Sequence, residues 1–304
     1  DATAVFFGSL SASLGPYVQA MGDMPTLYGN VCYPPATAPK PAPTFFCVGA
    51  SVMTDALTFV ELFKEIAKDK DNIKMGLVSA DIPGCRYFHE DVMKKALEAR
   101  GVEVVGVEIV PPAITDMSSV AGKLKKAGAN GIIQYCLVGQ MLALGEALKQ
   151  LDWDGTYMVT AQHETTAPGM EKAQYPNMYG LQSFALPGDT PVWQDIKAAH
   201  AQFRPKLQVI DQRFGWANGM VLEKALRACG FPCEREKLVE VMNNLTMDDP
   251  KFTELFMGEM KWSPDQHVSD VKGYQITHWD EEQGALVNVL DEPYRVESAP
   301  MEAR

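Results

Sequence analysis

Hydrophobic and polar positions follow two periods in the middle of the chain. Short apolar runs, typical of buried strands, recur about every 25 to 30 residues. Between them, apolar residues are spaced three or four positions apart, as on one face of a helix. Strands that alternate with helices predict a parallel sheet covered by helices on both faces, an α/β fold. The predicted strands are residues 74–81, 102–110, 131–136, 156–160 and 178–186.

The helices between these strands carry residues that favour helix ends. Asp55 and Asp116 stand where N-caps are expected, and Gly101 and Gly128 stand where helices should finish. The flanks add further elements. They are predicted strands at 4–7, 26–28, 258–262, 273–279 and 286–290, and helices at 191–203, 211–228 and 234–243.

The 304 residues suffice for two domains of about 150 residues. Residues 188–270 cannot form a compact lobe alone, so we expect them to pack with residues 1–51 as a first lobe. Residues 52–187 with 271–304 then form the second lobe. The chain would cross near residues 51, 187 and 270, and several short crossings predict a hinge beside a cleft.

The charge balance excludes some partners. Asp and Glu number 39 against 27 Lys and Arg, a net charge of −12, which disfavours nucleic acid and anionic membrane surfaces. No apolar run approaches the ~20 residues of a membrane-spanning helix. Because the chain begins at Asp1 with no signal peptide, we expect that it was processed or that part of it is missing.

The cysteines form no Cys-x-x-Cys motif, and no His lies at zinc-ligand spacing, so neither a metal nor another cofactor is predicted. Cys32 with Cys47, and Cys229 with Cys233, flank short segments and are predicted disulfides. Free cytosolic thiols at all six positions are the alternative. The remaining two, Cys85 and Cys136, lie among apolar residues and are predicted buried thiols.

Catalytic motifs are missing from the sequence. There is no glycine-rich nucleotide loop, no Gly-x-Ser-x-Gly and no His-Glu-x-x-His. Cys85 and His89 lie four residues apart, but no third group that would orient a base can be identified. The chain is therefore not predicted to be an enzyme.

Polar residues follow several predicted strands, and ligands of open parallel sheets bind outside the carboxyl ends of the strands. Strand 4–7 leads into a serine-rich turn, which can bind a carboxylate or can simply cap a helix. The predicted ligand residues of the first lobe are Ser11, Ala12, Ser13, Asn30 and Val31. Those of the second lobe are Asp81, Leu137, Ala161, Gln162, His163 and Glu164.

Residues 74–160 resemble the second lobe of type I periplasmic solute-binding proteins, in the leucine/isoleucine/valine-binding branch. The similarity lies in EARGVEVV (98–105), DMSS (116–119), KKAGANGII (125–133) and GTYMVT (155–160). It extends more weakly to GSLSASLGP (8–16) and to residues 257–284. The resemblance implies two doubly wound lobes and an exported receptor without a cofactor, which delivers a small polar or aromatic solute to an ABC permease.

Two departures from the family pattern change these expectations. The family's opening strands and helices, about 65 residues, are absent, so the first lobe should lack two strands. The family's ammonium-binding carboxylate and its aromatic platform align with Ala161 and Leu137. The chain should then prefer a neutral or anionic solute with an apolar body over leucine, unless Glu164 or Asp81 meets the ammonium.

Two alternatives stay open. A cytosolic ligand-sensing regulator could have the same fold, and the oxidation state of Cys229 and Cys233 would distinguish it from an exported receptor. An α/β hydrolase-type enzyme is the third reading, and it requires a nucleophile–base pair that the sequence does not show.

Overall fold

The computed structural model describes residues 5–7, 20, 22–28, 42–49, 51–135, 137–160, 175–206, 213–268 and 273–295. Contacts divide the chain into two units. Unit 1 contains Asp1–Thr54, Ser183–Gly273 and Tyr294–Arg304, and unit 2 contains Asp55–Gln182 and Tyr274–Pro293. The unit boundaries lie three to five residues from the predicted lobe boundaries: 54 against 51, 182 against 187, and 273 against 270. The segment from Tyr294 differs, since it was predicted in the second lobe and is grouped with unit 1.

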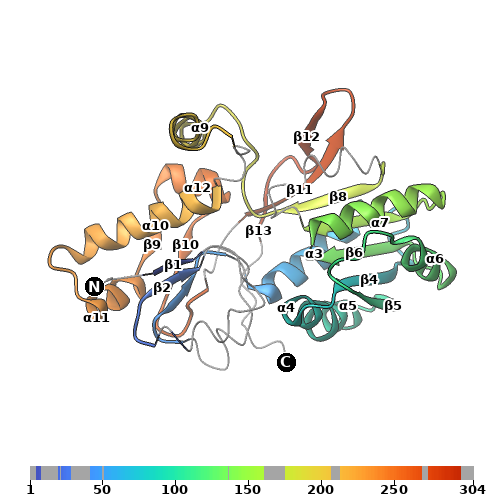
Figure 1. Cartoon of the computed structure of the whole chain (residues 1–304), viewed down its shortest axis with the longest axis horizontal. Helices are drawn as coiled ribbons and strands as arrows, with labels where there is room; N and C mark the ends of the chain where they lie inside the picture. The colour runs from blue at the N-terminus through green and yellow to red at the C-terminus, as the bar shows by residue number, and fades with distance from the viewer. Residues whose placement is uncertain are drawn as a thin grey trace. The chain divides into compact units, whose positions relative to one another are not determined.

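Unit 2 is built on one sheet with the strand order β12-β11-β8-β7-β6-β4-β5 (Figure 1). Strands β4 to β8 run parallel, as predicted, whereas β11 pairs antiparallel with both β8 and β12. The strands are β4 (Lys74–Ala80), β5 (Glu103–Val110), β6 (Gly131–Tyr135), β7 (Thr156–Thr160), β8 (Met178–Gln182), β11 (Gly273–Asp280) and β12 (Ala285–Asn288).

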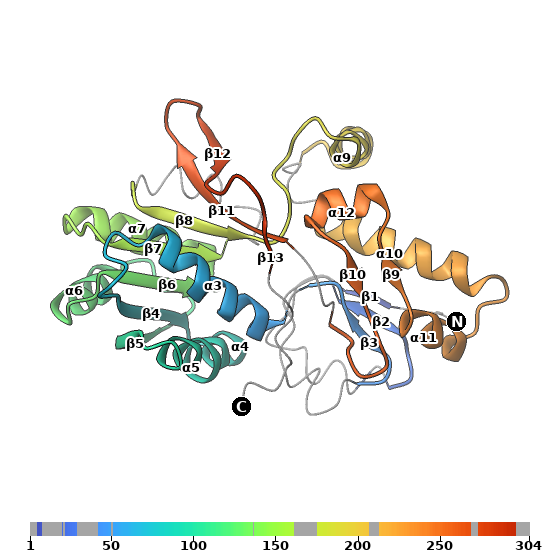
Figure 2. The ribbon, with the colours of Figure 1, turned by 180° about the vertical axis from the view of Figure 1, so that it is seen from behind.

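Helices cover both faces of this sheet. On one face, Leu124 of α6 lies against Gly76 and Gly106, where an added Cβ would come within 3.0 Å of the leucine. On the other face, the ring of Phe63 in α3 lies against Gly131. Helix α7 passes in front of the sheet in Figure 1, and α3 in Figure 2. The helices are α3 (Val52–Ile66), α4 (Pro83–Arg86), the π-helical turn η1 (Tyr87–Met93), α5 (Lys94–Glu98), α6 (Ser118–Lys126) and α7 (Val138–Gln150).

Unit 1 combines short strands with four helices among its described residues. Strands β1 (Val5–Phe7), β2 (Thr26–Tyr28) and β3 (Phe45–Cys47) form a parallel sheet in that order. Its core packs side chains such as Trp193, Val221, Phe252 and Trp262. The other elements are α9 (Pro191–Phe203), α10 (Arg213–Cys229), α11 (Arg235–Met242), β9 (Thr246–Met247), α12 (Pro250–Phe256), β10 (Met260–Lys261) and β13 (Tyr294–Arg295). Strands β3, β9 and β13 and helix α12 had not been predicted.

The cysteines differ in part from the prediction. Cys229 is bonded to Cys233 with an S–S distance of 1.99 Å, as expected from their spacing. Cys47 is also in a disulfide, and none of the described cysteines is free. The prediction that Cys85 is a thiol is wrong: it is fully buried, as expected, but disulfide-bonded. Cys32 and Cys136 lie outside the described residues.

Two of the four predicted helix-end residues are correct, and the two predicted N-caps are wrong. Gly101 and Gly128 have φ values of 72° and 83°, the left-handed conformation that often ends a helix. The N-cap of α6 is Met117, one residue after the predicted Asp116, although Asp116 Oδ1 accepts a hydrogen bond from the Ser118 N–H at 2.9 Å. Asp55 is not an N-cap. It lies inside α3, and Ser51 Oγ instead accepts the first-turn N–H of Thr54 at 3.0 Å.

Two features are absent from the described residues. No helix among them is long and apolar enough to cross a membrane. Within the same part of the chain, no group of three or more His, Cys, Asp or Glu side chains is arranged to hold a metal ion.

Candidate functional site

The parallel strands of unit 2 end at one carboxyl edge, where ligands bind in open parallel sheets. Two predicted site residues lie there. Asp81 directly follows β4, and Leu137 stands between β6 and α7. Because β4 pairs directly with β6, the structure places these two residues at the ends of neighbouring strands.

The remaining predicted ligand residues lie outside the described part of the chain, and their roles stay predictions. They are Ser11, Ala12, Ser13, Asn30, Val31, Ala161, Gln162, His163 and Glu164.

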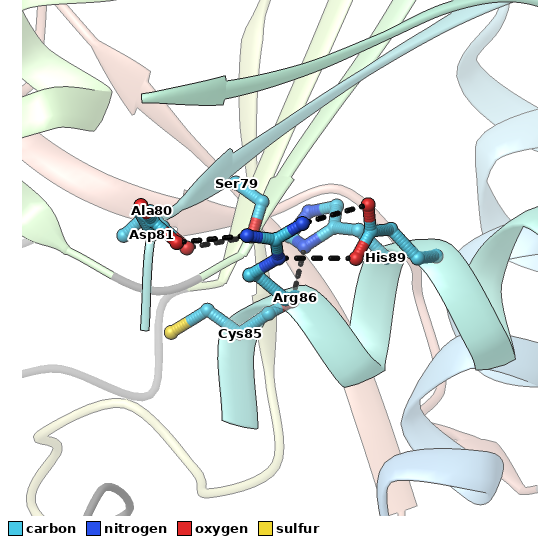
Figure 3. Close-up of polar contacts among 7 residues, drawn as sticks. Ser79, Ala80, Asp81, Cys85, Arg86 and His89 are labelled. Carbon is cyan, nitrogen blue, oxygen red and sulfur yellow. Dashed lines mark hydrogen bonds and ion pairs between the residues drawn. The ribbon is translucent and has the colours of Figure 1, made fainter. Parts of the chain in front are cut away.

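The carboxylate of Asp81 is held in an ion pair (Figure 3). Arg86 Nη1 donates to Asp81 Oδ1 at 3.1 Å, and Arg86 Nε donates to Glu90 Oε2 at 3.2 Å. The two carboxylates, Glu90 more than Asp81, raise the pKa of the Arg86 guanidinium. All three side chains are partly exposed, so the pairs are weak. A ligand ammonium at Asp81 would nevertheless compete with Arg86.

Leu137 adjoins a hollow of about 520 Å³ that lies wholly within unit 2. Its backbone is extended, and its side chain caps none of the first N–H groups of α7. Gln140 Nε2 donates to the Pro111 carbonyl at 2.9 Å, while its buried Oε1 has no hydrogen-bond partner among the described residues. The lining is mainly apolar and includes Pro112, Ile114, Leu137, Val138, Leu142 and Ala143, with Thr115, Gln140 and Glu146 as polar members. Such a surface suits hydrocarbon or a ring better than a charged group.

His89, in the turn η1, is fully buried beside the same edge. Its Nδ1 lies 2.9 Å from the Cys85 carbonyl, and its Nε2 lies 3.3 Å from the Tyr135 backbone nitrogen. A neutral ring with its proton on Nδ1 satisfies both bonds. Burial lowers the pKa of His89 to about 4, against a smaller opposing effect of the Cys85 bond. Because Cys85 is disulfide-bonded, this neighbouring pair contains no thiol nucleophile.

The sequence interpretation missed the position of Asp55. Its carboxylate is fully buried and accepts hydrogen bonds from the hydroxyl groups of Tyr135 and Tyr274. One signal was available: Asp55 precedes Phe59 and Phe63 by four and eight residues, so it shares their buried stripe. A carboxylate in such a stripe requires partners.

The chain belongs to the periplasmic binding protein family, whose sequence model matches residues 1–284. No curated protein matched the sequence. This assignment agrees with the parallel sheet and the two units described above, and it confirms the predicted fold class.

Solved structures support the type I fold. A branched-chain amino acid ABC transporter structure from Thermus thermophilus with bound valine has a TM-score of 0.77 and 18% identity, over 96% of this chain and 78% of that chain. A solute-binding protein from R. palustris in complex with 4-hydroxybenzoate has a TM-score of 0.76 and 17% identity, over 97% of this chain and 79% of that chain. A fatty acid ABC transporter substrate-binding protein from Thermomonospora curvata has a TM-score of 0.72 and 18% identity, over 96% of this chain and 74% of that chain.

The buried His89 predicts a loss of stability in acid. Its pKa in the folded protein, about 4, lies below the ordinary value of 6.5, so the unfolded chain binds the proton first as the pH falls. The free energy of unfolding should be at its full value above pH 6.5 and fall by about 3 kcal/mol as the pH approaches 4.

Urea unfolding at several pH values between 7 and 4 measures this loss. His89→Gln should be less stable than the parent at pH 7 but should lose less stability on acidification. The free energy of unfolding of the variant should still fall somewhat with pH, because burial also lowers the pKa of His267. If the free energy of unfolding fell equally with pH in parent and variant, the acid loss would not come from His89.

Proposed function

We propose that this protein is an extracytoplasmic receptor that binds a small solute and delivers it to an ABC permease. The observation that carries the proposal is the match to the periplasmic binding protein family over residues 1–284. The similar structures named above come from ABC transport systems and hold or are named for valine, 4-hydroxybenzoate and a fatty acid. A ligand that contacts both lobes would favour their closure.

We propose further that the preferred solute is neutral or anionic and has an apolar body. The apolar hollow beside Leu137 supports this class. Asp81 is already paired with Arg86, so a solute ammonium would have to compete with the guanidinium for this carboxylate. Ala161, at the position expected for the ammonium-binding carboxylate, has no acceptor in its side chain, and a buried ammonium without acceptors is costly.

The opposite end of the solute is assigned to the first lobe. We propose that hydroxyl and backbone N–H groups of Ser11, Ala12 and Ser13 bind its carboxylate or carbonyl, with Asn30 and Val31 contributing from the next strand end. Such donors suit an oxygen acceptor and not an ammonium.

A cytosolic ligand-sensing regulator of the same fold is the second candidate. The disulfide between Cys229 and Cys233 favours the exported receptor, because disulfides persist in oxidising compartments and are rare in the cytosol.

The solute preference is tested by calorimetric titration of purified protein with 4-hydroxybenzoate, benzoate, leucine and valine. An aromatic carboxylate should bind at least about tenfold more tightly than leucine, a difference of roughly 1.4 kcal/mol. Leu137→Glu should weaken binding of the aromatic carboxylate, because the introduced carboxylate would face the ring and the negative charge of the solute. Submicromolar leucine or valine binding that Glu164→Ala abolishes would contradict the proposal.

The serine turn is tested by the double variant Ser11→Ala/Ser13→Ala. Loss of hydrogen bonds to a charged group should cost ~1.5–3 kcal/mol, which weakens carboxylate binding about 10- to 100-fold. Ser119→Ala, an exposed serine of α6, is the control and should leave the affinity unchanged. An affinity of the double variant within about twofold of the parent would show that the turn does not bind the solute.

A further inference from the structure

Asp55, Tyr135 and Tyr274 form a buried polar cluster within unit 2. The Tyr274 hydroxyl donates to Asp55 Oδ1 at 2.9 Å, and the Tyr135 hydroxyl donates to Asp55 Oδ2 at 3.3 Å. Asp55 and Tyr274 are fully buried, and Tyr135 is 3% exposed. Burial, and then the charge of Asp55, raise the pKa of Tyr274, so its hydroxyl keeps the proton that it donates.

The cluster lies where the chain passes between the two units. Thr54 is the last residue of the first stretch of unit 1, and Asp55 is the first residue of unit 2. Gly273 ends a later stretch of unit 1, and Tyr274 is the next residue of unit 2. The bond between Asp55 and Tyr274 therefore fastens together the unit 2 ends of two crossings that are 219 residues apart in the sequence.

Tyr135, the third residue of the cluster, connects the crossings to the candidate site. Tyr135 is the last residue of β6, two positions before Leu137. Its hydroxyl is bonded to Asp55 and its backbone N–H to His89, so the end of β6 is held from two sides. Each carboxylate oxygen of Asp55 accepts one tyrosine, which satisfies a charge that would be costly to bury alone.

We propose that Asp55 is a positioning residue, which clamps two of the crossings to the end of β6 so that they move as one body with the strand that presents Leu137. The part that concerns Leu137 rests on the proposed function. The clamp itself requires no particular solute. Without it, the crossings could bend inside unit 2, and lobe closure would no longer bring Leu137 to a fixed place.

The test uses a matched pair of substitutions in the full chain without added solute. Tyr274→Phe removes one hydroxyl from the clamp. Tyr157→Phe removes an equally buried hydroxyl from the same sheet, which is bonded to Gln134 Oε1 and to the Met141 carbonyl and makes no bond to the residues of the clamp. Asp55→Leu removes both acceptors, and Tyr274→Phe remains informative if that variant does not fold.

Spin labels on Lys95→Cys in unit 2 and Lys237→Cys in unit 1 report the distribution of distances between the units, and hydrogen exchange reports local opening. Tyr274→Phe should broaden the distribution and should speed exchange at residues 52–58 and 273–277 by about tenfold. Tyr157→Phe should do neither. A distribution as narrow as that of the parent would overturn the proposal, even if local exchange were faster.

Titration with 4-hydroxybenzoate separates this proposal from the proposed function. If the parent protein binds it, Tyr274→Phe should weaken binding several-fold and Tyr157→Phe should not, and equal effects would count against the clamp. If the parent binds none of the four compounds tested above, the solute proposal fails, and the label distances still decide for or against the clamp.

Discussion

Burial of both faces of the parallel sheet in unit 2 is the constraint on which the rest of that unit depends. Every residue of β6 and β7 is buried, with helices α6 and α7 on one face and α3 on the other. Polar groups within such strands need internal partners, as Gln134 Oε1 and the Tyr157 hydroxyl have in each other. Groups that meet solvent or a ligand are therefore confined to the strand ends, where Asp81 and Leu137 lie.

The same constraint explains what the sequence could predict. Strands buried on both faces appear as continuous apolar runs, and the predicted 156–160 and 131–136 agree with β7 and β6 to within one residue. Helix α9 was predicted at its observed bounds, since Pro191 suits the first turn and the apolar spacing continues to Phe203. Some short elements were missed, such as β3 and β9, because two or three residues are too few to show a period; β1 and β2, which are equally short, were nevertheless predicted.

The polar interior could not be predicted, because its partners are distant in sequence. Asp55 meets Tyr135 and Tyr274 across 80 and 219 residues, so local pattern favoured the simpler N-cap interpretation. Cys85 was interpreted from its apolar neighbours, which indicate burial but not oxidation. The π-helical turn η1 and the role of His89 within it also depend on tertiary contacts to the end of β6.

These observations connect the fold to a receptor function. The family assignment identifies a binding protein, and the carboxyl edge of unit 2 offers an apolar hollow beside Leu137 and an aspartate, Asp81, that is paired with Arg86. Mass spectrometry of the solute that co-purifies with the native protein tests the proposed solute class most directly. We predict a neutral or anionic compound with an apolar body, such as an aromatic carboxylate or an amide; leucine, isoleucine or valine as the bound compound would contradict this prediction.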